Sequence, residues 1–118
     1  MKVETTWHGT TAVARLMGSI DTVDTEGASE VLNEIVSAKP GSLVLDFAGV
    51  EYIASMGLSM LLKVAQNMRK AKSPLFIAAA TPAVKNILDT VHLGAAIPMV
   101  ATVEAALERL GAKAAAHI

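Results

Sequence analysis

Apolar and polar residues alternate with two different periods along the chain, and each change of period marks the start of a predicted element. Residues 3–8 and 11–17 have the character of extended strands, and Gly9-Thr10 between them is typical of a two-residue hairpin turn. An apolar stripe with helical spacing follows at residues 28–35, and Lys39-Pro40-Gly41 ends it. The pattern therefore predicts a hairpin followed by a first helix.

The rest of the chain repeats a unit of one strand and one helix. Short apolar runs, typical of strands covered on both faces, occupy residues 43–45, 75–79 and 97–100. Amphipathic helices are predicted after them, at residues 57–72, 82–91 and 103–110. Between the first of these strands and its helix, Asp46 is expected to begin a turn in the segment DFAGV.

The predicted order is β-β-α-β-α-β-α-β-α, which defines an α/β fold. Strands that alternate with helices pair in parallel through right-handed crossovers, and the opening hairpin adds an antiparallel edge. We expect a single domain over residues 1–111, with a mixed β-sheet and about four α-helices, and a flexible C-terminal tail at residues 112–118. Functional sites in such sheets gather where strands lead into helices, and the loops around Asp21 and Ser55 are two such places.

Residues 52–70, YIASMGLSMLLKVAQNMRK, place polar and small residues where a strand leads into a helix. Ser55 lies at or next to the first free N–H groups of that helix. Serine is a preferred N-cap, worth about 1 kcal/mol, so capping alone would explain it, and modification of its hydroxyl is the alternative. Met56 is expected to be exposed, which indicates a contact surface, whereas Gly57 alone indicates only a tight turn or a close approach. The predicted apolar stripe of the helix consists of Leu58, Leu61, Leu62, Ala65 and Met68.

Composition narrows the class of protein further. A chain of 118 residues is long enough for one domain with a core, and no apolar run reaches the roughly 18 residues of a membrane-spanning helix. The first residues lack the pattern of a signal peptide, and the absence of cysteine excludes disulfides and thiolate metal sites. We therefore expect a cytoplasmic protein without membrane insertion. A net charge of −1 and 3% aromatic residues provide neither a charged surface nor a stacking platform for direct nucleic-acid binding.

The sequence contains few residues that are candidates for catalysis or metal binding. The three histidines lack the spacing of metal ligands, and the sequence contains no dinucleotide-binding, P-loop or hydrolase motif. A phospho-accepting receiver domain would have a similar length, with Asp46 as the acceptor, but it also needs an acidic pair after its first strand and a lysine near its last. Neither is present, so this interpretation is rejected. We expect no cofactor, no metal and no enzymatic activity. The basic residues Lys63, Arg69, Lys70 and Lys72 are expected to form the solvated face of a helix.

These features together resemble the STAS domain, the module shared by sulfate transporters and bacterial anti-sigma factor antagonists. The family has a buried strand, a short turn and a D-S-[ST]-G-L segment that opens an amphipathic helix, and here this region is LVLDFAGVEYIASMGLSMLL. The phosphorylatable serine of the family falls on Ser55, and its glycine and leucine fall on Gly57 and Leu58. The G-x-[IL]-D turn of the family is matched by residues 18–21, and TPAVKNILDTVHLGAAIPMV resembles a later family segment.

The resemblance covers residues 3–110 and implies an anti-sigma factor antagonist that works by partner switching. The unphosphorylated protein would bind a serine kinase with an ATP-binding fold that is also the anti-sigma factor. Phosphorylation of Ser55 would release it, and a metal-dependent serine phosphatase would reset it. The residues implied in partner binding are Asp21, Ser55, Met56 and Gly57.

The sequence departs from the family pattern on both sides of the serine. Ala54 replaces the usual aspartate, and Met56 replaces serine or threonine. The loss of the acid favours an alternative, an accessory STAS subunit that docks permanently on an ABC-type lipid-transport complex without phosphorylation. A STAS protein that controls some other output, such as biofilm formation, is a third alternative.

Overall fold

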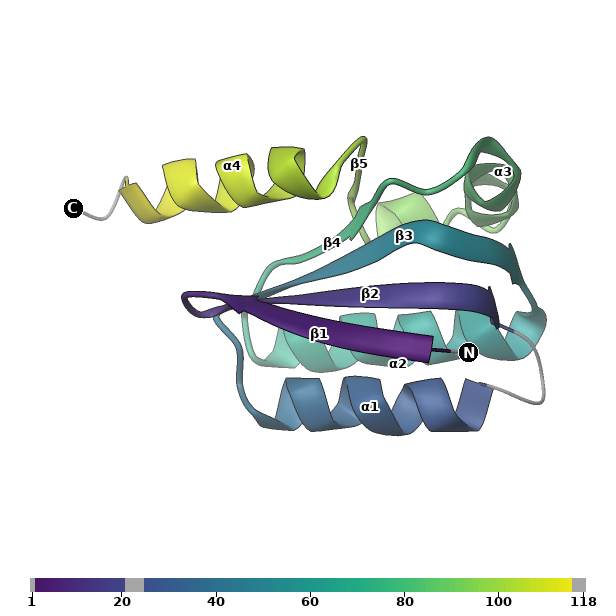
Figure 1. The fold of residues 1–118 in the computed structure, drawn as a ribbon, viewed down its shortest axis with the longest axis horizontal. Coiled ribbons are helices and arrows are strands. Elements are labelled where there is room, and N and C mark those ends of the chain that lie inside the picture. The colour runs from purple at the N-terminus through teal and green to yellow at the C-terminus, as the bar shows by residue number, and fades with distance from the viewer. Residues whose placement is uncertain (1, 21–24, 116–118) are drawn as a thin grey trace.

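The computed structural model shows one mixed sheet of five strands with helices on both faces (Figure 1). It describes residues 2–20 and 25–115. The elements are β1 (Lys2–His8), β2 (Thr11–Ile20), α1 (Thr25–Ser37), β3 (Ser42–Ile53), α2 (Ser55–Lys70), β4 (Leu75–Ala78), α3 (Pro82–Thr90), the short 3₁₀ helix η1 (Leu93–Ala95), β5 (Met99–Val100) and α4 (Val103–Ala115). The strand order is β1-β2-β3-β4-β5, with β1 and β2 antiparallel and all other pairs parallel. The predicted order of elements, the mixed sheet and the antiparallel hairpin are confirmed.

Helices pack on both faces of the sheet, and the buried apolar residues form one large cluster and one small one. Helices α1 and α2 cover one face, and α3 and α4 lie on the other (Figure 1). The main core includes large apolar residues of β3, of which Leu43, Leu45 and Phe47 are fully buried, together with residues of α1 and α2 such as Leu32 and Leu61. A much smaller cluster joins Val13, Val44 and Ala78 to Ala106 of α4. Because the strands are apolar on both faces, the central sheet is buried from both sides, as predicted for parallel strands.

The strand β3 is much longer than the sequence predicted, and the turn expected at DFAGV is wrong. The segment stays paired with β2, since Arg15 is opposite Asp46 and Met17 is opposite Gly49. One extra residue of β3 is accommodated between these pairs as a bulge. The Asp46 side chain still makes the local bond typical of a turn, because its Oδ1 accepts from the Ala48 N–H at 3.0 Å. Pairing with a ten-residue neighbour therefore overrode the turn signal.

The buried face of helix α2 differs slightly from the predicted apolar stripe. Its buried residues are Gly57, Met60, Leu61, Val64, Ala65 and Met68. Leu62 is 43% exposed, so its assignment to the apolar stripe is wrong. The residues three and four positions apart from Leu61 fill the interface with the sheet, and Leu62 lies a further 100° around the helix. Leu62 thus provides an exposed apolar position on α2.

Helix α4 continues to Ala115, beyond the predicted start of the C-terminal tail at residue 112. Ala112, Ala114 and Ala115 are strong helix formers, so the alanine-rich end extends the helix. Residues 116–118 lie outside the described part of the chain. The domain limit at residue 111 and a flexible tail remain predictions.

A buried hydrogen bond joins the starts of the two central strands, where Thr11 Oγ1 and Ser42 Oγ lie 2.7 Å apart. Thr11→Val is expected to lower the free energy of unfolding by about 1–3 kcal/mol, because it leaves a buried hydroxyl without its partner. The double variant Thr11→Val/Ser42→Ala should lose less than the sum of the two single variants. Urea denaturation of the three variants measures this coupling, and strictly additive losses would show that the bond is unimportant.

Candidate functional site

The candidate site lies at the carboxyl end of β3, where the chain turns into α2. Ala54 is extended, with φ −94° and ψ 172°, and occupies the N-cap position without a side-chain bond. Ser55 is exposed and is the first residue of the helix, and the Leu58 N–H donates to the Ala54 carbonyl at 3.0 Å to close the first turn. The prediction that the helix begins within a turn of Ser55 is confirmed. The interpretation of Ser55 as the N-cap is wrong, because Ala54 holds that position.

The charge distribution along α2 favours an anion at its start. The first turn contains no acidic residue, whereas Arg69 and Lys70 lie in the last turn. The first backbone N–H groups of a helix have no intrahelical acceptors, and the helix dipole gives this end a partial positive charge. A negative group on Ser55 would therefore meet favourable electrostatics.

Two large side chains flank Ser55 in the sequence and are exposed. Tyr52, at the end of β3, is 52% exposed, and Met56, in the first turn of α2, is 53% exposed. The exposure predicted for Met56 is confirmed. Tyr52 is not among the site residues predicted from the sequence. Its position directly before a strand-to-helix junction was the signal that could have identified it. We refer to Tyr52, Ser55 and Met56 as the switch surface.

The other two predicted site residues are Gly57 and Asp21, and the structure describes only the first. Gly57 is buried in α2, so it offers little surface of its own, and its part in partner binding remains a prediction. Asp21 lies outside the described residues. The last residue of β2, Ile20, is paired with Ile53, which places the carboxyl ends of β2 and β3 side by side.

Because Ser55 is not the N-cap, we expect Ser55→Ala to change stability very little. Alanine is a good residue for the interior of a helix turn, and no cap bond is lost. Thr102 is a matched control, since its Oγ1 accepts from the Ala105 N–H at 3.0 Å at the start of α4. Thr102→Ala should lower the free energy of unfolding by about 1 kcal/mol. Chemical denaturation compares the two, and an equal loss for Ser55→Ala would restore the capping role.

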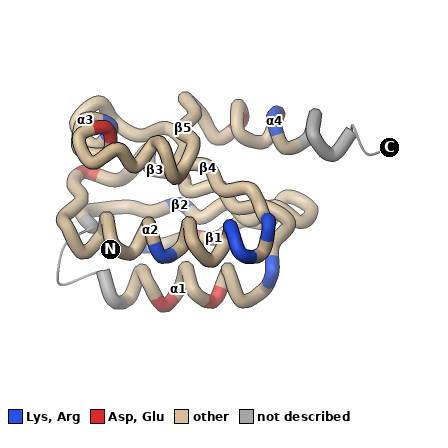
Figure 2. Tube along the Cα trace, turned by 180° about the vertical axis from the view of Figure 1, so that it is seen from behind, with Lys and Arg blue, Asp and Glu red and all other residues tan. Residues whose placement is uncertain are grey.

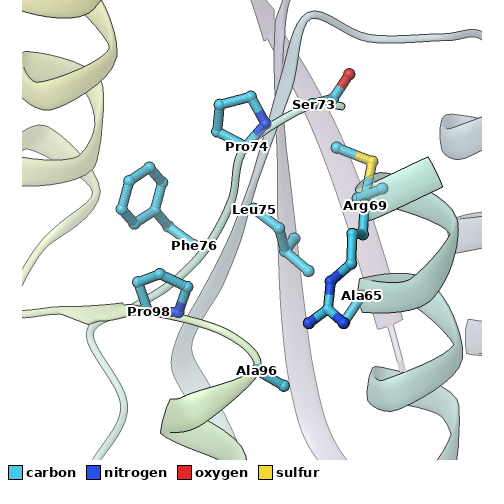
Figure 3. Close-up of a pocket in the computed structure, with 9 residues that line it drawn as sticks. Ala65, Arg69, Ser73, Pro74, Leu75, Phe76, Ala96 and Pro98 are labelled. Atoms are coloured by element: carbon cyan, nitrogen blue, oxygen red, sulfur yellow. The ribbon is translucent and has the colours of Figure 1, made fainter. Parts of the chain in front are cut away.

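The structure also has a hollow near the C-terminal end of α2 (Figure 3). Its volume is about 260 Å³, and it lies between the C-terminal half of α2, the start of β4 and the segment before β5. Arg69 is the one charged residue in its lining, which is otherwise largely apolar. Arg69 is 14 residues along the helix from Ser55, or about 21 Å at 1.5 Å per residue, so the hollow is separate from the switch surface.

The basic residues predicted to lie on a solvated helix face do so. Lys63, Arg69 and Lys70 are exposed on α2, and Lys72 is exposed just after it (Figure 2). Within residues 2–20 and 25–115, no group of three histidine or acidic side chains is arranged to hold a metal ion. In the same ranges, no helix is long and apolar enough to cross a bilayer.

An antiparallel hairpin that leads into a parallel sheet, with a serine opening the helix after the long central strand, defines a small α/β domain of the STAS type. The chain belongs to the STAS domain family, whose model matches residues 2–106. The resemblance inferred from the motifs is therefore confirmed.

Individual relatives are more distant. A stretch of 54 residues is 35% identical to the anti-sigma-F factor antagonist RsfB of Mycobacterium tuberculosis, and it covers 46% of this chain and 44% of that protein. The matched stretch thus spans less than half of either chain. A crystal structure of an anti-sigma factor antagonist from Mycobacterium paratuberculosis superposes with a TM-score of 0.85 at 24% identity, covering 92% of each chain. The phosphorylated form of the Bacillus cell fate determinant SpoIIAA matches with a TM-score of 0.72 at 16% identity, over 92% of this chain and 99% of that one. These structures establish the shared fold.

Proposed function

We propose that this protein is an anti-sigma factor antagonist that works by partner switching in the cytoplasm. In its unmodified form it binds an anti-sigma factor that is also a serine kinase with an ATP-binding fold. Phosphorylation of Ser55 by that kinase releases it, and a metal-dependent serine phosphatase restores the binding form. The protein has no enzymatic activity of its own in this scheme. The observation that carries the proposal is that Ser55 is exposed at the first position of α2 and is flanked in the sequence by two large exposed side chains, Tyr52 and Met56.

The local structure suits such a modification. A phosphate at a helix N-terminus meets free N–H groups and the positive end of the helix dipole, so the fold tolerates it. Since Ser55 does not occupy the N-cap position, esterification of its hydroxyl removes no N-cap bond. The phosphate adds about −1.5 to −2 charges to a surface on which Tyr52 and Met56 are available to a partner. Burying that charge against an apolar partner surface is costly, and this cost drives release.

The relatives support the proposal in two ways. The mycobacterial protein that shares 35% identity over part of the chain is named as an anti-sigma-F factor antagonist. The SpoIIAA structure was determined in a phosphorylated form. A permanent subunit of an ABC-type lipid-transport complex is the second candidate, because Ala54 replaces the acid that usually precedes the serine. Affinity capture from native cells with mass spectrometry distinguishes the two, since it recovers either a serine kinase or a permease and its ATPase.

Binding through the switch surface is expected to weaken when a charge is placed beside Ser55. Met56→Asp should weaken binding to the captured kinase at least tenfold, about 1.4 kcal/mol, while the melting temperature stays nearly constant. An exposed position in the first turn of a helix tolerates aspartate well. Leu62→Asp is the matched control, because Leu62 is exposed to a similar extent on the same helix but lies two turns, about 10 Å, beyond Ser55.

A binding titration by calorimetry, paired with thermal unfolding, tests this prediction. If Leu62→Asp weakens binding as much as Met56→Asp does, the contact surface is not centred on Ser55. If Met56→Asp lowers stability and binding together, Met56 supports the fold and does not contact the partner.

A further inference from the structure

The two edges of the sheet are constructed in different ways. At one edge, β5 has only two residues and follows Pro98, which has no N–H to donate. At the other edge, β1 has seven residues, contains no proline, and pairs with β2 without a register shift. A long, flat edge strand offers unpaired N–H and C=O groups as a template for another strand. The β5 edge is thus protected, whereas the β1 edge is open.

The direction of the backbone groups shows which residues of β1 are available. The Thr10 carbonyl accepts from the Gly41 N–H at 2.9 Å, so it points toward β3. Backbone groups alternate in direction along a strand, so Thr11 and every second residue after it point toward β1. Their partners on β1, which are Glu4, Thr6 and His8, therefore point toward β2. The residues whose N–H and C=O groups point outward are Val3, Thr5 and Trp7.

These outward groups are self-complementary in an antiparallel pairing centred on Thr5. Thr5 then lies opposite Thr5 of a second copy, and Val3 lies opposite Trp7 in both directions. Each of these pairs exchanges hydrogen bonds, and an aromatic residue opposite a β-branched one is a favourable cross-strand pair. Trp7 is 48% exposed in the single chain, so the pairing would cover a large apolar side chain.

Charge favours the same register. Lys2 Nζ lies 3.2 Å from Glu4 Oε1, so the two charges of β1 compensate each other within the strand. With Thr5 at the centre, Glu4 is opposite Thr6 and no two carboxylates meet. A register centred on Glu4 would place like charges opposite each other, which is destabilising. A register centred on Thr6 would leave the outward groups of Val3 without partners.

We propose that β1 is a homodimerisation strand, and that two copies of this chain join their sheets edge to edge through antiparallel β1–β1 pairing centred on Thr5. This inference is independent of the partner-switching proposal. The two-fold axis passes midway between the two Thr5 residues, so the carboxyl ends of the β3 strands, and with them the two switch surfaces, lie at opposite ends of the joined sheet. Both copies can then bind a partner at the same time.

A proline scan of β1 tests the pairing. Thr5→Pro removes an N–H that points outward, so it should weaken dimerisation at least about tenfold and change monomer stability little. Thr6→Pro is the matched control, because it removes a donor to β2 and should lower the melting temperature strongly. Sedimentation velocity over a range of concentrations measures the dimer. Unchanged dimerisation of a folded Thr5→Pro variant would overturn the proposal.

Cysteine substitution tests the register, and it is a clean experiment because the chain contains no cysteine. In Thr5→Cys the two Cα atoms would be about 5.5 Å apart, within disulfide range. In Thr6→Cys each cysteine would lie opposite Glu4, so the two would be offset by two residues along the strands, beyond the roughly 7 Å that a disulfide spans. We expect rapid oxidation of the first variant to a covalent dimer and slow oxidation of the second. The reverse order would overturn the register centred on Thr5.

The single tryptophan of the chain provides a third measurement, since Trp7 lies on β1 itself. Its fluorescence emission should shift to shorter wavelength as the concentration rises and the indole becomes covered, and Thr5→Pro should abolish the shift. The proposal is wrong if the wild-type protein sediments as a monomer with a constant emission maximum at every concentration, and the Thr5→Cys variant forms no covalent dimer.

Discussion

Phosphorylation of Ser55 is expected to weaken binding to the partner kinase by at least a hundredfold, about 2.8 kcal/mol. The exposed hydroxyl accepts the phosphate at the start of α2, and the fold remains intact because the helix dipole favours the charge. The loss falls on the interface, where a neutral and partly apolar surface acquires a double negative charge. Titration of the unmodified and the kinase-treated protein against the partner measures this change, and intact-mass measurement establishes the phosphate.

Substitutions separate the charge from the hydroxyl. Ser55→Asp should bind poorly while it remains folded, and Ser55→Ala should bind constitutively. Ser59 provides a matched control, because it is an exposed serine one turn further along α2. Ser59→Asp should retain nearly all of the affinity. If the unmodified, phosphorylated and substituted proteins all bind alike, Ser55 is not a switch, and the permanent-subunit function takes precedence.

Phe47→Ala is expected to have the largest effect on stability, a loss of about 3–5 kcal/mol in the free energy of unfolding. Phe47 is fully buried, and it lies in the bulged part of β3 between the pairs formed by Asp46 and Gly49. Removing its ring leaves a cavity between the sheet and the helices, which the surrounding main chain cannot fill. A loss of this size is a large fraction of the stability of a small domain.

Phe76 is the matched control, because the chain has only two phenylalanines and this one is partly exposed. Its ring packs at the edge of the smaller cluster, with the Arg109 guanidinium 5.9 Å from its centre. Phe76→Ala should therefore cost clearly less than Phe47→Ala. Urea denaturation compares the two variants. Equal losses would show that the smaller cluster contributes as much as the main core.

The sequence predicted the elements well where a single local signal determined them. The hairpin at Gly9-Thr10 and the helix that follows Thr81-Pro82 were both identified, because turn and capping chemistry acts within a few residues. The order of strands and helices then fixed the parallel pairing, since strands joined by helices can pair in few other ways. The serine at the start of α2 was found in the same way, at the point where the period of the pattern changes.

The features that the sequence did not predict depend on neighbours far along the chain. Asp46 kept its local bond to Ala48, yet the strand continued, because β2 offered further residues with which to pair. Tyr52 is not among the predicted site residues, because its exposure depends on which helices reach that end of the sheet. The N-cap moved from Ser55 to Ala54 because the backbone becomes helical one residue earlier than capping preferences suggest. The length of β3 and the exposure of Tyr52 thus depend on tertiary neighbours, whereas the position of the N-cap is a local difference of one residue.

The placement of Ser55 at the first helical position also has an evolutionary consequence. A residue that caps a helix is constrained by folding, so selection for stability would preserve it even after its regulatory role had been lost. The fold places no such demand on the Ser55 side chain, which neither caps the helix nor is buried. Alanine, aspartate or glutamate could replace it in related proteins at little cost to folding. The identity of this residue in a lineage therefore records the history of the signal alone.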